Sequence, residues 1–266
     1  MILESKWGSV YYEDHGGAQA PVLVFCHGVS MDHRTFDAQV HHYAKTHRVI
    51  VWDYPGHGQS AALDPGQPFC ETAARILWAL LDHLHIQEAV LAGQSLGSAV
   101  IQLAATDQPV RVQALVHISG LSLYPPVSSS LRLLAPLVSP MIALYPSGRI
   151  YRTFARHRSL LDSTAAYMEE VSAKNGKQVM SQVTKALLRT MVRGLDAPLP
   201  HPALICTGEH EMKAVHDRIV RWGQRAQEGQ LAVIPDAHHI LNMDNPERFH
   251  RVLDDFLNAL EKTSSP

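Results

Sequence analysis

The sequence lacks a strong excess of charge of either sign. Its 266 residues include 23 lysines and arginines and 25 aspartates and glutamates, which gives a net charge of −2 with histidine neutral. A nucleic-acid-binding domain usually shows a basic excess, and a disordered tail is often strongly acidic. With 46% hydrophobic and 18% charged residues, the composition is that of an ordinary globular protein. The charge balance therefore indicates no particular binding partner, and we expect no binding of nucleic acid.

Cysteine is scarce. The three cysteines, Cys26, Cys70 and Cys206, are odd in number, far apart and mostly inside apolar runs. This pattern excludes a disulfide framework and a cysteine zinc site, and it favours buried, reduced thiols and a cytoplasmic location. The 17 histidines include no HExxH or similar metal-ligand spacing. We expect no metal and no organic cofactor.

Long hydrophobic runs are also missing. No stretch of about 18 apolar residues is free of charges and helix breakers, as a membrane span requires. The densest apolar stretch, residues 131–145, contains Arg132, Pro136 and Pro140. Residues 1–17 lack the basic start and apolar stretch of a secretory signal, and their alternation of apolar and polar residues predicts a first pair of strands. We therefore expect no membrane span.

Short apolar segments of strand length do recur along the chain, each closed by glycine, proline or a polar residue. They are residues 21–28, 48–53, 88–93, 114–119, 203–208 and 230–235. Helical patterns lie between them, the clearest at 71–85, where one face is apolar. Strands too apolar to be half-exposed, alternating with helices, are typical of a parallel sheet covered on both faces. The sequence predicts an α/β fold.

One interval interrupts this alternation. Between Ser119 and Ala203, about 80 residues pass without a convincing strand, far more than a usual connection. The interval begins with a proline- and serine-rich passage, and residues 167–192 predict two helices joined at Asn175-Gly176. We interpret residues 121–200 as a helical cap inserted into a core formed by residues 1–120 and 201–266. Its apolar side chains either pack it onto the sheet or line a pocket, and we expect packing for most of Leu131, Leu133, Leu134, Leu137, Val138, Met141, Ile142 and Leu144.

A candidate nucleophile follows the strand predicted at 88–93. Gly93-Gln94-Ser95-Leu96-Gly97 matches G-x-S-x-G, a pattern that is weak evidence alone but stronger between a strand and a helix. Such a sharp turn forces a strained backbone on the serine and requires glycines where a Cβ would collide with the neighbouring element. The alternative is a glycine-flanked helix N-cap. In the favoured interpretation the Ser95 hydroxyl projects clear of the sheet.

Taken with the segments that follow, the sequence resembles the α/β-hydrolase family over most of the chain outside the cap. The resemblance implies a mostly parallel twisted sheet flanked by helices, with an inserted helical cap. His27-Gly28-Val29 matches the family's oxyanion loop, so Val29 and Leu96 are expected to supply the two oxyanion-hole amides. Asp32 is expected to cap a helix.

Residues 53–60 match the family's D-x-P-G-x-G-x-S turn, which is a fold signature. Asp53 and His57 are therefore expected to be structural, although they are the residue types of a catalytic triad. Neither is expected to take part in the chemistry.

The resemblance places the catalytic base at His239. A serine hydroxyl needs a base within hydrogen-bond reach to act as a nucleophile at neutral pH. His238 stands where the family usually has glycine, which makes it the alternative base. The residues that align with the family pattern and favour His239 are Pro235, Ala237, Asp244, Pro246 and Glu247.

The third member of the expected triad is Glu211. The family's common G-E-x-D appears here as G-E-H-E at residues 208–211, so a glutamate replaces the more usual aspartate. The order Ser95, Glu211, His239 is that of the family. Glu209 and Asp217 are nearby carboxylates that we expect on the surface.

The resemblance implies a serine hydrolase that forms an acyl-enzyme intermediate. The apolar cap favours a small, largely apolar carboxylic ester, thioester or lactone as substrate. Two alternatives stay open: a C–C bond hydrolase or lyase-like synthase that uses the same triad, and a ligand sensor with slow turnover. A homodimer also stays open, since no feature of the sequence decides the oligomeric state.

Overall fold

In the computed structural model, the strands form one mixed sheet. The structure describes residues 1–62, 64, 66–127 and 135–264. Within them the sheet has eight strands in the order β1-β2-β4-β3-β5-β6-β7-β8, and only the pairs β1–β2 and β2–β4 are antiparallel. The strands are β1 (Ile2–Ser5), β2 (Gly8–His15), β3 (Val22–Cys26), β4 (Arg48–Trp52), β5 (Ala89–Gln94), β6 (Val112–Ile118), β7 (Ala203–Gly208) and β8 (Gly229–Ile234). The predicted α/β fold with a mostly parallel sheet is confirmed.

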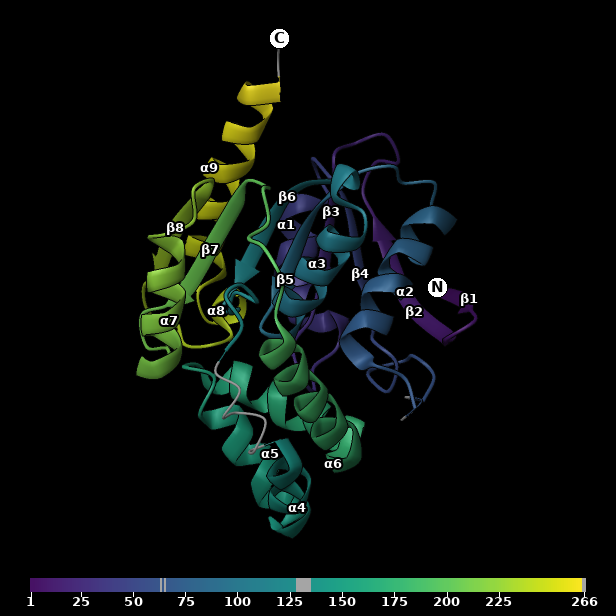
Figure 1. Cartoon of the computed structure of the whole chain (residues 1–266), viewed down its shortest axis with the longest axis vertical. Helices are drawn as coiled ribbons and strands as arrows, with labels where there is room; N and C mark the ends of the chain where they lie inside the picture. Colours follow the sequence, from purple (N-terminus) through teal and green to yellow (C-terminus); the bar gives the residue numbers. More distant parts are fainter. Residues whose placement is uncertain (63, 65, 128–134, 265–266) are drawn as a thin grey trace.

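Helices cover both faces of this sheet (Figure 1). Helices α2 (Phe69–His83), α3 (Leu96–Asp107) and α7 (Lys213–Gly223) pack on one face, and α1 (Asp37–Tyr43) and α9 (Pro246–Ser264) pack on the other. The central strands need this double cover because they are apolar on both sides, and every residue of β5 and β7 is buried. The result is two hydrophobic cores, one on each side of the sheet.

Short helices complete the core. They are the 3-10 helices η1 (His33–Phe36) and η2 (Pro109–Arg111) and the one-turn helix α8 (Leu241–Asp244). Asp32 caps η1, because its side chain accepts a hydrogen bond from Arg34 N at 3.1 Å. This confirms the role predicted for Asp32.

Between β6 and β7 the described residues form three helices: α4 (Ala135–Leu144), α5 (Ser147–Arg156) and α6 (Asp162–Arg193). Figure 1 shows them together beyond the ends toward which β6 and β7 point, which is the carboxyl edge of the sheet. Helix α6 is interrupted at Gly176, with φ 83° and ψ 163°. The two helices predicted on either side of Asn175-Gly176 are therefore confirmed.

The packing expected for the apolar residues of α4 is wrong for several of them. Leu137, Met141 and Leu144 are 50%, 68% and 85% exposed. The reason is the place of α4 at the far end of the helical group, where it packs against α6 and leaves its other side to solvent (Figure 1). Leu131, Leu133 and Leu134 lie outside the described residues.

The three cysteines are free and buried, as predicted. Among the residues that the structure describes, no helix combines the length and the apolar character needed to cross a bilayer.

Candidate active site

Ser95 occupies the turn between β5 and α3, with φ 51° and ψ −106°. A positive φ is strained for any residue with a Cβ. The turn is held by the Ser95 N–H, which donates to the Ile118 carbonyl of the neighbouring strand at 2.9 Å. It is also very tight: a Cβ on Gly93 would lie 2.3 Å from the Gly97 carbonyl carbon, and one on Gly97 would lie 2.0 Å from the Cys26 carbonyl oxygen. Both glycines are required, as the sequence predicted.

His239 and Glu211 meet at the same edge of the sheet, in the loops that follow β8 and β7. The His239 Nδ1–H donates to Glu211 Oε2 at 2.6 Å. The other carboxylate oxygen, Oε1, accepts the Met212 N–H at 2.9 Å. Both residues are buried, at 8% and 6% exposed. The pair thus fixes the ring so that Nδ1 carries the hydrogen and Nε2 is the free nitrogen.

The surroundings keep the Glu211 carboxylate charged. Burial, the largest influence, raises its pKa, but the hydrogen bonds from His239 and Met212 together with the nearby histidines outweigh it, so the pKa is lowered. A charged carboxylate can then stabilise an imidazolium on His239.

Two main-chain N–H groups, those of Val29 and Leu96, were predicted as oxyanion donors. Within the described residues, neither the Val29 nor the Leu96 N–H donates a hydrogen bond. Leu96 is the first residue of α3, so its amide belongs to the positive end of the helix dipole. These are the two residues that the sequence suggested as oxyanion donors.

Gln94 links the loops that carry these groups. Its buried side chain donates from Nε2 to the His239 carbonyl at 3.2 Å. A Cβ on Gly28 would lie 2.0 Å from Gln94 Oε1, so a larger residue there would force the Gln94 side chain to move. The sequence predicts no role for Gln94, because this residue occupies a freely variable position of the G-x-S-x-G pattern.

His238, the alternative base, has different hydrogen-bond partners from His239. Its Nδ1 accepts the His239 N–H at 2.7 Å, and its own N–H donates to Asp244 Oδ2 at 3.0 Å. In the described part of the chain, the ring of His238 makes no hydrogen bond to a carboxylate. Burial lowers its pKa. The structure thus pairs His239, and not His238, with Glu211.

Asp244 connects the loop of the two histidines to the helical insertion. Besides the His238 N–H, its carboxylate accepts the N–H groups of Leu160 at 3.0 Å and Leu161 at 3.3 Å. The Ile240 N–H donates to the Arg158 carbonyl at 3.1 Å. Residues 158–161, between α5 and α6, are therefore connected by hydrogen bonds to the segment that contains His239.

Asp53 and His57 lie outside the His239–Glu211 pair, as expected. Asp53 is fully buried and accepts the N–H groups of His33 and Gln59, both at 2.8 Å. Burial lowers the pKa of His57 to about 4. These contacts hold the turn of residues 53–60 together.

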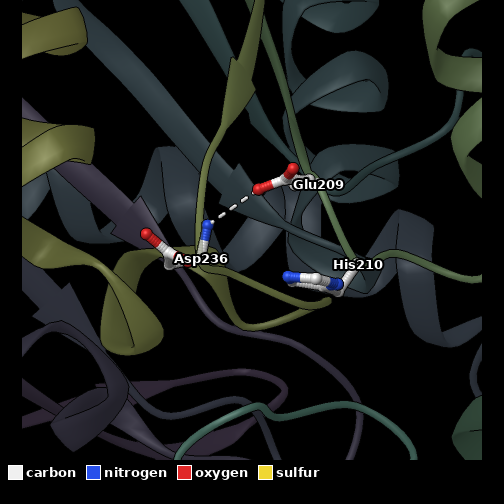
Figure 2. A group of neighbouring side chains, drawn as sticks. All are labelled: Glu209, His210 and Asp236. Atoms are coloured by element: carbon white, nitrogen blue, oxygen red, sulfur yellow. Dashed lines mark hydrogen bonds between the residues drawn. The ribbon is translucent and has the colours of Figure 1, made fainter.

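One group of side chains lies at distances suited to a metal ion. Ligand atoms of Glu209, His210 and Asp236 lie within 4.8 Å of one another. Figure 2 shows the Glu209 carboxylate directed at the main-chain nitrogen of Asp236, to which it is hydrogen-bonded at 3.2 Å. All three residues are exposed, and the group includes neither Glu211 nor His239. We therefore assign it no part in the candidate site.

Comparisons with known proteins agree with this fold. The chain is 31% identical to the magnesium-chelatase 30 kDa subunit of Rhodobacter capsulatus over 163 residues, which is 59% of this chain but only 55% of that subunit. It is 23% identical to 3-oxoadipate enol-lactonase 1 of Acinetobacter baylyi over 98% of this chain and 97% of the relative. The crystal structure of an enol-lactonase from Burkholderia xenovorans LB400 superposes with a TM-score of 0.82 at 20% identity, covering 97% and 100% of the two chains.

The model of the alpha/beta hydrolase family matches residues 23–252, which include Ser95, Glu211 and His239. This match covers most of the chain and agrees with the strand order and with the turn at Ser95. The chain belongs to the alpha/beta hydrolase family.

Proposed function

We propose that this protein is a serine hydrolase in which Ser95 is the nucleophile, His239 the general base and Glu211 the residue that orients the base. The Ser95 oxygen attacks a carbonyl carbon while His239 Nε2 takes the hydroxyl proton. The carbonyl oxygen becomes an oxyanion, which accepts hydrogen bonds from the Val29 and Leu96 amides. Each such donor typically contributes about 3 to 4 kcal/mol to the transition state.

Collapse of this intermediate breaks the bond to the leaving group, which takes the proton from His239. Water then attacks the acyl-Ser95 carbonyl with His239 again as base, and the acid is released. These steps need only the side chains and amides named above.

The observation that carries the proposal is the buried His239–Glu211 hydrogen bond of 2.6 Å at the sheet edge where Ser95 holds its strained conformation. A histidine held by a charged carboxylate is the partner that a serine nucleophile needs. The free amides of Val29 and Leu96 support the same chemistry.

A small, largely apolar ester, thioester or lactone is the proposed substrate. The apolar composition of residues 121–200 supports it, and we propose that this insertion is the cap over the site, on a core of residues 1–120 and 201–266. A relative that matches over nearly the whole chain is named an enol-lactonase, which supports a lactone in particular. A screen of esters of graded acyl length, thioesters and lactones tests this, with the Ser95→Ala protein as the blank.

Covalent labelling tests the nucleophile. A fluorophosphonate probe should add to the wild-type protein once, and mass spectrometry of peptides should place the adduct on Ser95. The Ser95→Ala variant should not be labelled. Ser163→Ala, at an exposed serine of α6, is the matched control and should be labelled like wild type. Labelling that persists in Ser95→Ala would show that the nucleophile is another residue.

A further inference from the structure

A cavity lies on the sheet face between α3 and α7. Its volume is about 1060 Å³, and none of Ser95, Glu211 and His239 lines it. The floor is β6, one wall is α7, and the remaining boundary is formed by residues 121–127 and 195–201. Those two segments connect the helical insertion to β6 and β7. The cavity is therefore distinct from the proposed catalytic centre.

The inner part of this cavity is apolar. Leu115 of β6 forms the floor, and Leu121, Leu199 and Trp222 lie around it. The Trp222 ring contacts the His117 ring, with centroids 4.6 Å apart. A cavity of this size with an apolar interior is typical of sites for small organic ligands.

The outer part carries positive charge. Arg218 and Arg221 line the cavity from one side of α7, and Arg225 lines it from the turn that follows this helix. They are exposed, and in the described residues none of them forms an ion pair with a carboxylate. Glu228 is the single carboxylate among the lining residues. Three guanidinium groups against one carboxylate favour an anion at the mouth of the cavity.

A directed hydrogen-bond donor lies at the floor. Gln102 Nε2 donates to the Leu121 carbonyl at 2.9 Å and to the Ser98 carbonyl at 3.0 Å, and the Ser98 hydroxyl lies 2.8 Å from His117 Nδ1. The orientation of the Gln102 amide follows from its Oε1, which accepts the Leu123 N–H at 2.8 Å. Burial lowers the pKa of His117 to about 3, so the ring is neutral, and in the tautomer whose Nδ1 accepts the Ser98 hydroxyl the proton is on Nε2. Within the described residues the hydrogen bond of this ring is made by Nδ1, and none joins Nε2 to another group.

A buried hydrogen-bond acceptor of a lining residue also lacks a donor within the described residues. His201 lines the cavity and donates from Nε2 to the Pro109 carbonyl at 2.9 Å, which leaves Nδ1 as an acceptor. That Nδ1 is buried and without a partner in the described residues. Buried polar atoms are nearly always satisfied by protein, water or ligand.

From this arrangement we propose that the cavity binds an amphipathic organic anion. Its mostly apolar body lies on Leu115 and Trp222 and carries one acceptor atom for a hydrogen bond from His117 Nε2, and its anionic group faces Arg218, Arg221 and Arg225. The ligand class is thus a mostly apolar body with one acceptor atom that ends in one carboxylate, phosphate or sulfonate group.

The probe for the test is 8-anilinonaphthalene-1-sulfonate, an aromatic sulfonate whose fluorescence rises in apolar surroundings. Titration should show saturable binding at a single site, weakened by added salt because the arginines are exposed. The Arg218→Gln/Arg221→Gln variant should bind the probe about tenfold more weakly, the loss expected when charged hydrogen bonds are removed. Decanoate should displace the probe, and decanol, of the same chain length but uncharged, should not.

Two further proteins complete the experiment. Arg248→Gln/Arg251→Gln removes two exposed arginines with the same spacing on α9 and should bind the probe like wild type. Ser95→Ala should also bind it unchanged, whether or not Ser95 is a nucleophile. Equal affinity in wild type and Arg218→Gln/Arg221→Gln, or equal displacement by decanol and decanoate, would overturn the proposal. Loss of binding in Ser95→Ala alone would place the probe in the active site and overturn it too.

Discussion

Ser95 holds a conformation that costs backbone strain, and its neighbours explain how the strain is maintained. The Ser95 N–H is bound to the Ile118 carbonyl, and Gly93 and Gly97 allow the helix to start against the strand. The positive φ is therefore fixed by a hydrogen bond from the next strand and by close backbone contact. Strain of this kind persists only where the surrounding structure enforces it.

Glu211 is the residue whose proposed role is most open to test. Glu211→Gln keeps the shape of the side chain but removes the charge that stabilises an imidazolium on His239. We expect kcat for ester or lactone hydrolysis to fall by about 10⁴-fold, the usual effect of neutralising a triad acid, with little change in the melting temperature.

The matched control for this variant is Glu209→Gln. Glu209 lies two residues earlier, is exposed and is bonded to the Asp236 N–H instead of a histidine. Its replacement should leave kcat within about twofold of wild type. Equal effects of the two substitutions would mean that Glu211 acts only on stability or that the acid lies elsewhere.

Among the elements, α6 shows how a break in a helix serves the contacts around it. Its first part ends at Asn175, whose side chain donates to the Met31 carbonyl at 3.1 Å and accepts the Gly58 N–H at 3.0 Å. Ser172, one turn earlier, donates to the Ser30 carbonyl at 3.2 Å. The helix thus binds two loops of the core, and the positive φ of Gly176 lets the chain change direction immediately afterwards.

Two glycine substitutions should have opposite effects on the stability of the protein. Gly176→Ala adds a Cβ that meets no atom within 4 Å, but it places alanine at φ 83°. The free energy of unfolding should therefore fall by about 1 kcal/mol. Gly148→Ala, in α5, also meets no atom within 4 Å and has no positive φ, so it should stabilise by about 0.5 kcal/mol. Urea denaturation measures both, and stabilisation by Gly176→Ala would contradict the explanation of the break.

At the scale of the whole molecule, the core contains histidines that are held neutral. Burial lowers the pKa of His27 and of His117 from 6.5 to about 3 and that of His57 to about 4. His33 is the opposite case: burial lowers its pKa, but the bond to Asp53 and the nearby carboxylates outweigh this, and the pKa is raised. Among these four histidines, the folded protein therefore opposes protonation of three and favours protonation of one.

Stability should therefore fall in mild acid. Below pH 6.5 the unfolded chain binds protons at His27, His57 and His117 that the folded chain does not, so the free energy of unfolding decreases as the pH falls from 6.5 toward 4. Each such histidine contributes up to about 1.4 kcal/mol per pH unit. His117→Asn should flatten the dependence measured by urea denaturation, and the exposed His41→Asn should not. Stability that is constant from pH 7 to 5 would show that the three histidines titrate normally.

The sequence by itself determined the α/β fold, the strands, the break in α6 and the residues proposed for catalysis. Strands buried on both faces appear in the sequence as continuous apolar runs. The turns at Ser95 and Gly176 need glycine, so they too can be predicted from a short local pattern. The G-E-H-E and P-D-A-H-H segments likewise identified Glu211 and His239 by motif before any distance was known.

Only the tertiary structure decided which of two adjacent histidines meets Glu211, because that depends on how the loops after β7 and β8 approach each other. It also decided that Leu137, Met141 and Leu144 are exposed, since an apolar helix face is buried only if another element covers it. The contact between Gln94 and the His239 carbonyl and the cavity between α3 and α7 join residues far apart in the chain. Neither leaves a local pattern in the sequence, because each arises only when separate segments pack together.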